Sequence, residues 1–100
     1  GLHFDFSKIP FLSGARGYAE RGIFPGGAFD NKGHFEHQVK FSAGLGEPDQ
    51  MLLFDPQTSG GLLFGVAREN LSAFETRAKE INQPYWVIGE AREGKGIEVE

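Results

Sequence analysis

Residues 55–61, Asp-Pro-Gln-Thr-Ser-Gly-Gly, separate two short apolar runs, Met-Leu-Leu-Phe at 51–54 and Leu-Leu-Phe-Gly-Val at 62–66. Each run is too brief for a helix and apolar enough for a buried strand, so we predict a strand on either side. The connector is longer and more polar than a tight hairpin requires. Its carboxylate, amide, hydroxyls and glycines could form an anion-binding concavity. It lacks the Lys and the spacing of a Walker motif, and residue types alone favour the alternative, a structural turn in which Asp55 caps backbone N–H groups.

Hydrophobic periodicity predicts the elements around this connector. An apolar stripe and an i,i+4 Glu–Lys pair indicate a helix over residues 69–81, and a shorter helix is expected over 13–21. Residues 23–36 are rich in Gly, Pro, Asp and Asn and are expected to form a loop. Alternating or short apolar patterns predict the remaining strands, which are 2–6, 37–42, 85–88 and 97–99.

The predicted order, β-α-β-β-β-α-β-β, belongs to the α+β class. We expect a mixed, mainly antiparallel sheet with two helices packed on it. A chain of 100 residues can close only one core, so residues 1–100 are expected to form a single domain.

Composition excludes several classes of function. The chain has no cysteine, which excludes a disulfide framework, a thiolate zinc site and a thiol nucleophile. The formal net charge is -4 and no Lys/Arg stretch is present, so we expect no nucleic-acid partner. No apolar run approaches the ~20 residues that cross a bilayer, and nothing has the pattern of a secretion signal. We expect no membrane contact and a cytoplasmic location.

Two other clusters could carry chemistry. Residues 24–31, Phe-Pro-Gly-Gly-Ala-Phe-Asp-Asn, could lie over a ligand or an adjoining domain, although an ordinary connection explains the same residues. His34, Glu36 and His37 could hold zinc on a helical turn, but next to a predicted strand we expect solvent-exposed imidazoles. His3 is also expected at the surface. No nucleophile with a base beside it is recognisable, so the residues alone indicate no reaction.

The stretch Leu-Phe-Asp-Pro-Gln-Thr-Ser-Gly-Gly-Leu-Leu at 53–63 resembles the D-P-Q-T-S-G-G-L-L signature of the selenophosphate synthetases (selenide, water dikinases). Seven consecutive specified residues make the motif specific. Pro25-Gly26-Gly27 followed by Asn31 resembles the P-G-G-T-x-R-N segment of that family. The resemblance covers essentially the whole chain. It implies the C-terminal α+β domain that the family shares with the aminoimidazole ribonucleotide synthetase superfamily.

The resemblance also implies a function for a full-length protein. Members of the family form selenophosphate from selenide and ATP, release AMP and orthophosphate, and use Mg²⁺. Their glycine-rich segment with Cys or selenocysteine, the nearby Lys and the metal-binding aspartates would precede Gly1. We therefore expect residues 1–100 to be a C-terminal fragment of a two-domain enzyme, inactive and without cofactor alone. Its expected partners are the N-terminal ATP-binding domain of the same protein and, at full length, a second copy in a homodimer.

If the chain is part of such an enzyme, we hypothesise that several of its residues line a cleft between the two domains. They are Asn31, Asp55, Gln57, Thr58, Ser59, Gly60 and Gly61. None is expected to be catalytic or to bind metal. Ala28 and Asp30 depart from the family pattern, which has Thr and Arg there, and a carboxylate in place of a cation would repel phosphate. The alternatives are a non-catalytic module that binds a nucleotide or a protein, and a domain whose glycine loops serve folding alone.

Overall fold

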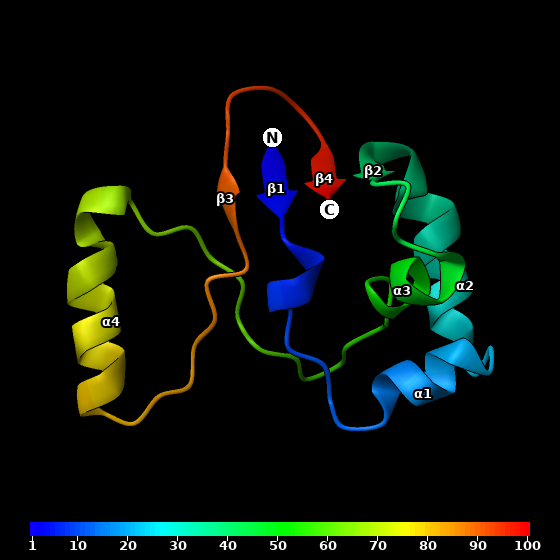
Figure 1. The fold of residues 1–100 in the computed structure, drawn as a ribbon, viewed down its shortest axis with the longest axis horizontal. Helices are drawn as coiled ribbons and strands as arrows, with labels where there is room; N and C mark the ends of the chain where they lie inside the picture. Colours follow the sequence, from blue (N-terminus) through cyan, green and yellow to red (C-terminus); the bar gives the residue numbers. More distant parts are fainter.

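The computed structural model describes residues 1–100, with a four-stranded sheet between α4 on one side and α1, α2 and α3 on the other (Figure 1). The strands, in the spatial order β2-β4-β1-β3, are β1 (Leu2–Phe4), β2 (Val39–Phe41), β3 (Gly89–Ala91) and β4 (Ile97–Val99). The α+β class and the mixed sheet are confirmed. The sheet is mainly parallel, however, because β4 lies between β1 and β2 and pairs parallel with both, while only β1 and β3 are antiparallel.

Four α-helices are present where two were expected. The two expected helices are α1 (Ala15–Glu20) and α4 (Leu71–Glu80). Two residues after the end of each helix, the backbone has a positive φ, 71° at Gly22 and 53° at Asn82. Such a left-handed residue terminates a helix and lets the following N–H groups satisfy its last carbonyls. Three short 3-10 turns complete the regular structure, η1 (Phe6–Lys8), η2 (Glu36–Gln38) and η3 (Arg68–Asn70). None of these helices could cross a membrane.

The prediction of a loop over residues 23–36 is wrong, because most of this stretch forms α2 (Gly26–Phe35). Its glycines disfavour a helix, but tertiary contacts override weak local propensity. Ala28 is fully buried, and the Lys32 ammonium lies 3.0 Å from a carboxylate oxygen of Glu47. The helix therefore depends on its packing against its neighbours.

The strand predicted over residues 51–54 is also wrong, because α3 (Glu47–Leu52) occupies most of that run. Pro48 stands in the first turn, where a missing N–H has no cost. Glu47 and Asp49 place negative charge at the same end of the helix, where it interacts favourably with the positive end of the helix dipole. These helix-start signals lie before the apolar run and outweigh it.

The strands predicted at 62–66 and 85–88 do not form in this structure. Residues 61–67 and 83–88 have no regular secondary structure, and β3 begins only at Gly89. A strand needs a neighbour for its backbone N–H and C=O groups, and residues 62–66 and 85–88 receive only one such bond, from the N–H of Asp5 to the carbonyl of Ile88. At the N-terminus, β1 ends at Phe4 and Phe6 belongs to η1.

The core lies on the side of the sheet where α1, α2 and α3 pack. Eight of the 100 residues are buried, and all but Ala78 belong to this part or to β1, η1 and β4. The expectation for His3 is wrong: it is 9% exposed, and its Nε2 lies 3.2 Å from a carboxylate oxygen of Glu100. Because β1 is a central strand with a neighbour on each side, even its polar residue is covered.

Candidate functional site

The two glycine-bearing motifs meet at the side of α2. The side-chain amide of Asn31 donates a hydrogen bond of 2.9 Å to the carbonyl of Phe54, the residue before the connector 55–61. One turn earlier, Gly27 lies against the ring of Pro56, where a Cβ at position 27 would stand 3.0 Å from Cγ of the proline. Glycine thus allows the ring to pack directly on the helix. The start of the connector is therefore fixed to α2 at two points.

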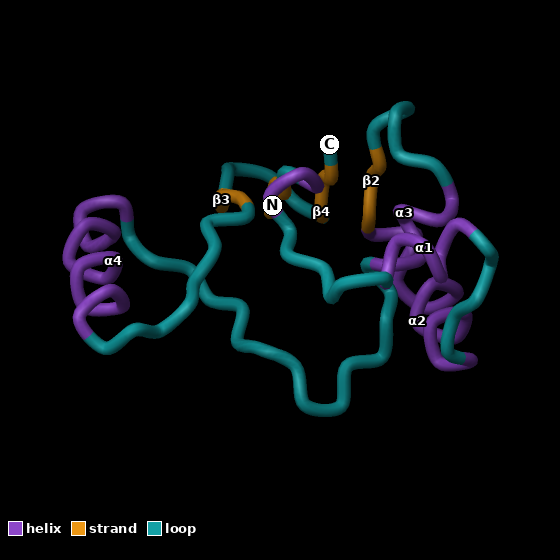
Figure 2. Tube along the Cα trace, turned by 60° about the horizontal axis from the view of Figure 1, so that its bottom comes forward, coloured by secondary structure: helices purple, strands orange, loops and turns teal.

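Beyond Pro56 the connector is open to solvent. Every residue from 55 to 61 is exposed, and the segment lies in the long loop between α3 and α4 that extends below the sheet in Figure 2. The backbone groups of residues 55–66 make no hydrogen bond to another backbone group. Gln57 folds back over Gly60, where its Oε1 would lie 2.6 Å from an added Cβ, whereas Gly61 has open space around it.

The polar side chains of the connector have no partners within the chain. Asp55, Gln57, Thr58 and Ser59 make no side-chain hydrogen bond. Asp55 therefore does not cap its own turn, which is the arrangement that residue types alone favoured. The connector offers one carboxylate, one amide, two hydroxyls and free backbone N–H groups on one exposed segment.

Such an array can bind an anionic or polar ligand only with help from a second surface. In bulk water two unit charges 4 Å apart attract by only about 1 kcal/mol, and the attraction rises severalfold where water is excluded. The connector has no covering element of its own. Its chemistry therefore suits the edge of a cleft whose other wall comes from elsewhere.

The structure gives the two departures in the 24–31 motif different positions. Ala28 is completely buried on the inner side of α2, so its methyl group packs in the core and cannot reach a ligand. Asp30 is exposed on the same helix. Sequence reasoning treated this motif as a loop and therefore missed the role of Asn31 as the residue that fixes the connector. The signal that could have found it is the helix-favouring Pro at position 25, directly before α2.

The histidine cluster does not form a metal site. His34 lies in the last turn of α2 with its ring edge-on to Phe35 at 4.6 Å, and His37 lies in η2. Both are exposed, as expected. Within residues 1–100, no three His, Cys, Asp or Glu side chains gather closely enough to hold a metal ion.

The one carboxyl group with a strongly shifted pKa lies away from the connector. Asp5 accepts hydrogen bonds from the hydroxyl and the N–H of Ser7, at 2.6 and 3.0 Å, and pairs with the Lys8 ammonium at 2.9 Å. The Ser7 hydrogen bond and the Lys8 contact lower the pKa of Asp5 to about 2. This group stabilises the turn η1 after β1 and is not part of the candidate site.

Nearly the whole chain is similar to curated selenide, water dikinases. It is 34% identical to that of Caldanaerobacter subterraneus subsp. tengcongensis over 98% of the chain, and 40% identical to that of Myxococcus xanthus over 95%. The identity to the Pseudomonas aeruginosa protein is 36% over 96% of the chain. The chain spans only 27–28% of the length of these relatives, as a C-terminal part of them. No protein-family model matches it.

Proposed function

Because the chain belongs to the selenide, water dikinase family over nearly all of its length, we propose that it is the C-terminal part of a selenophosphate synthetase. In this proposal the whole protein forms selenophosphate from selenide and ATP and releases AMP and orthophosphate. ATP and Mg²⁺ bind chiefly to an N-terminal part of the same polypeptide, for which the greater length of the relatives leaves room. The whole protein is a cytoplasmic homodimer.

In the same proposal, the connector 55–61 and Asn31 form the C-terminal edge of the cleft between the two parts. The observation that carries this role is the combination of a fixed start and a free remainder. Asn31 and Gly27 hold the first residues of the connector to α2, while the polar side chains that follow are exposed and unpartnered. A loop that served folding alone would use these groups for its own hydrogen bonds.

The hydroxyls of Thr58 and Ser59 are the groups that we propose to contact a phosphate-bearing ligand in the cleft. A hydrogen bond to a charged group contributes about 1.5–3 kcal/mol, so losing both would slow turnover by tenfold or more. The test replaces the matching segment of the Myxococcus xanthus relative with this chain and compares it with its Thr58→Ala/Ser59→Ala variant. The readout is ATP-dependent selenophosphate formation.

Thr76→Ala is the matched control, because Thr76 is an exposed hydroxyl on α4 that bonds only to the backbone carbonyl of Ser72, at 2.9 Å. We expect this variant to keep full turnover. Equal turnover of the double variant and the control would leave the connector with a structural role. A chimera that binds nucleotide but makes no selenophosphate would favour a non-catalytic binding module. Residues 1–100 alone are expected to form no selenophosphate.

A further inference from the structure

The chain exposes more surface than a folded monomer of its mass. Its accessible surface is 7581 Å² for 11.0 kDa, whereas a monomeric protein of this mass exposes about 5,600 Å². Its radius of gyration, 14.9 Å, also exceeds the roughly 13 Å of a compact 100-residue domain. The surplus of about 2,000 Å² is more than twice the area that one partner buries in a standard interface.

Much of the exposed apolar surface lies on two runs that flank α4, residues 62–64 and 85–87. The most exposed side chains in them are Leu62 at 91%, Leu63 at 67%, Trp86 at 59% and Phe64 at 57%. No charged residue occurs from 56 to 67 or from 81 to 89. Exposed strand edges normally carry charges that prevent unwanted pairing, so these two runs do not have the composition of a free edge.

The backbones of both runs are also unpartnered. Residues 62–66 and residues 85–87 make no hydrogen bond to another backbone group, and the carbonyl of the next residue, Ile88, accepts one from the N–H of Asp5 at 2.9 Å. The sheet edge at β3 differs: its Glu90 side chain is ion-paired with Arg92 at 2.7 Å. Apolar side chains together with free N–H and C=O groups are what an incoming strand requires.

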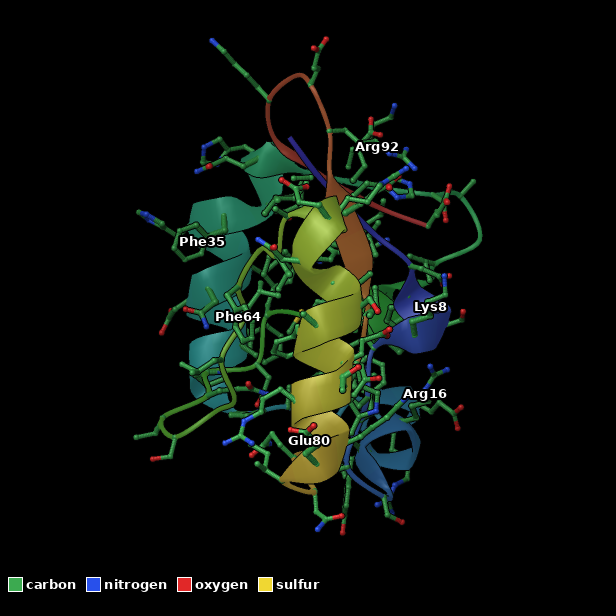
Figure 3. The ribbon with its side chains drawn as sticks, turned by 90° about the vertical axis from the view of Figure 1, so that its left-hand side faces the viewer. Lys8, Arg16, Phe35, Phe64, Glu80 and Arg92 are labelled. Atoms are coloured by element: carbon green, nitrogen blue, oxygen red, sulfur yellow. The ribbon has the colours of Figure 1, made fainter.

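An aromatic cluster holds the two runs close to each other. Phe64 stacks edge-on against Phe74 of α4 at 5.5 Å, and Phe74 stacks in the same way against Tyr85 at 5.6 Å. Figure 3 shows Phe64 on the loop that passes beside α4. Beyond the cluster, residues 85–87 and residues 7–10 line an open hollow of about 500 Å³. The runs are thus already placed next to one helix, with their other sides uncovered.

We propose that residues 62–66 and 85–88 are strands of a sheet that an apolar, extended segment of the same polypeptide, outside residues 1–100, completes. Residues 1–100 cover 27–28% of the length of the curated relatives. The rest of each relative is therefore more than two and a half times as long as residues 1–100 and is long enough to supply such a segment. A strand tethered in the same polypeptide acts at an effective concentration in the millimolar range, which a second copy at cellular concentration does not reach. The proposal concerns folding and does not depend on the reaction.

The test measures amide hydrogen exchange in two proteins: residues 1–100 alone, and the chimera in which they replace the matching segment of the Myxococcus xanthus relative. In the chimera we expect exchange of amides 62–66 and 85–88 to slow by about a hundredfold or more, because ladder hydrogen bonds protect them. In the 100-residue chain we expect these amides to exchange rapidly. Fast exchange in a chimera whose β1 and α4 amides are protected would overturn the proposal. Because the readout is exchange, an inactive chimera still tests it.

A substitution separates the tethered segment from a second copy. Leu63→Asp places a charge on the apolar run, and Ala73→Asp places the same charge on the exposed face of α4, next to Arg77 one turn later. We expect Leu63→Asp alone to restore fast exchange in the chimera, and neither variant to change the sedimentation of the 100-residue chain as a monomer. A dimer of residues 1–100 that Leu63→Asp dissociates would overturn the proposal in favour of a second copy, whether or not the chimera folds.

Discussion

Residues 55–88 and the rest of the molecule both contain runs of large apolar residues, but only the rest of the molecule buries them in a core. The sheet, η1, α1, α2, α3 and the turn after α3 together contain seven of the eight buried residues, whereas residues 55–88 contain only Ala78. Figure 1 shows the same contrast, with α4 at the end of two long loops and the other helices close to the sheet. An apolar sequence therefore produces a core only where the chain supplies a partner for it.

The segment 55–88 keeps its shape through a few contacts. The Phe64–Phe74–Tyr85 cluster and a hydrogen bond of 3.3 Å between Tyr85 Oη and Glu75 connect its loops to α4. Each aromatic pair contributes about 0.5–1.5 kcal/mol beyond the area that it buries. These contacts are enough to orient the loops but leave the apolar runs uncovered.

The strongest change in stability is expected from truncating a buried side chain near the sheet, compared with an exposed side chain in residues 55–88. Met51→Ala removes a side chain that is 2% exposed and leaves a cavity, so we expect a loss of about 2–5 kcal/mol in the free energy of unfolding. Leu62→Ala in the 100-residue chain should change it by less than about 0.5 kcal/mol. Urea unfolding measures both. A Leu62→Ala loss as large as that of Met51→Ala would show that the apolar run is already buried in solution.

A smaller effect is expected where the two regions join. Asn31→Ala removes the hydrogen bond to the Phe54 carbonyl, which is part-buried, and we expect a loss of about 0.5–1.5 kcal/mol in the free energy of unfolding. The same variant should leave the rate of amide hydrogen exchange in residues 55–61 unchanged, because the N–H groups of these residues make no backbone hydrogen bond in the first place. Gln38→Ala is the control, because Gln38 is exposed. Asn82→Ala is unsuitable, because the positive φ of Asn82 makes alanine unfavourable there. Equal stability of Asn31→Ala and Gln38→Ala would mean that the connector is not fixed through this bond.

The smallest expected effect is a pH dependence within the well-packed region. The pKa of Asp5 is about 2 in the folded chain against an ordinary 3.8, so its contribution to stability is present above about pH 4 and is lost as the pH falls towards 2. Ser7→Ala removes the hydroxyl that donates at 2.6 Å, and the pKa of Asp5 should rise towards its ordinary value. An NMR titration of the Asp5 carboxyl measures the change, with Ser72→Ala as the control. If the pKa of Asp5 in Ser7→Ala stays as low as in the unsubstituted chain, its low value comes from Lys8 instead.

The sequence predicted those elements whose signals are local. The helix near 69–81 has its own stripe and its own stop at Asn82, and the strand near 97–99 has clean alternation, so both appear as α4 and β4. The helix at 26–35 was missed, because its glycines argue against it and only the burial of Ala28 and the contacts of Asn31 and Lys32 stabilise it. The site was identified by its motif, but its attachment to α2 depends on a contact between residues 27 and 56, which no local pattern records.

The family, the α+β class and the polar connector can be inferred from the amino-acid sequence, because they follow from consecutive residues and from periodicity along the chain. Three other features depend on the packed fold: the parallel pairing of β4 with β1 and β2, the burial of His3 and the attachment of the connector to α2. Those features join residues up to 97 positions apart, as in the contact between His3 and Glu100. Their energy comes from burial and hydrogen bonds that exist only once distant segments have met.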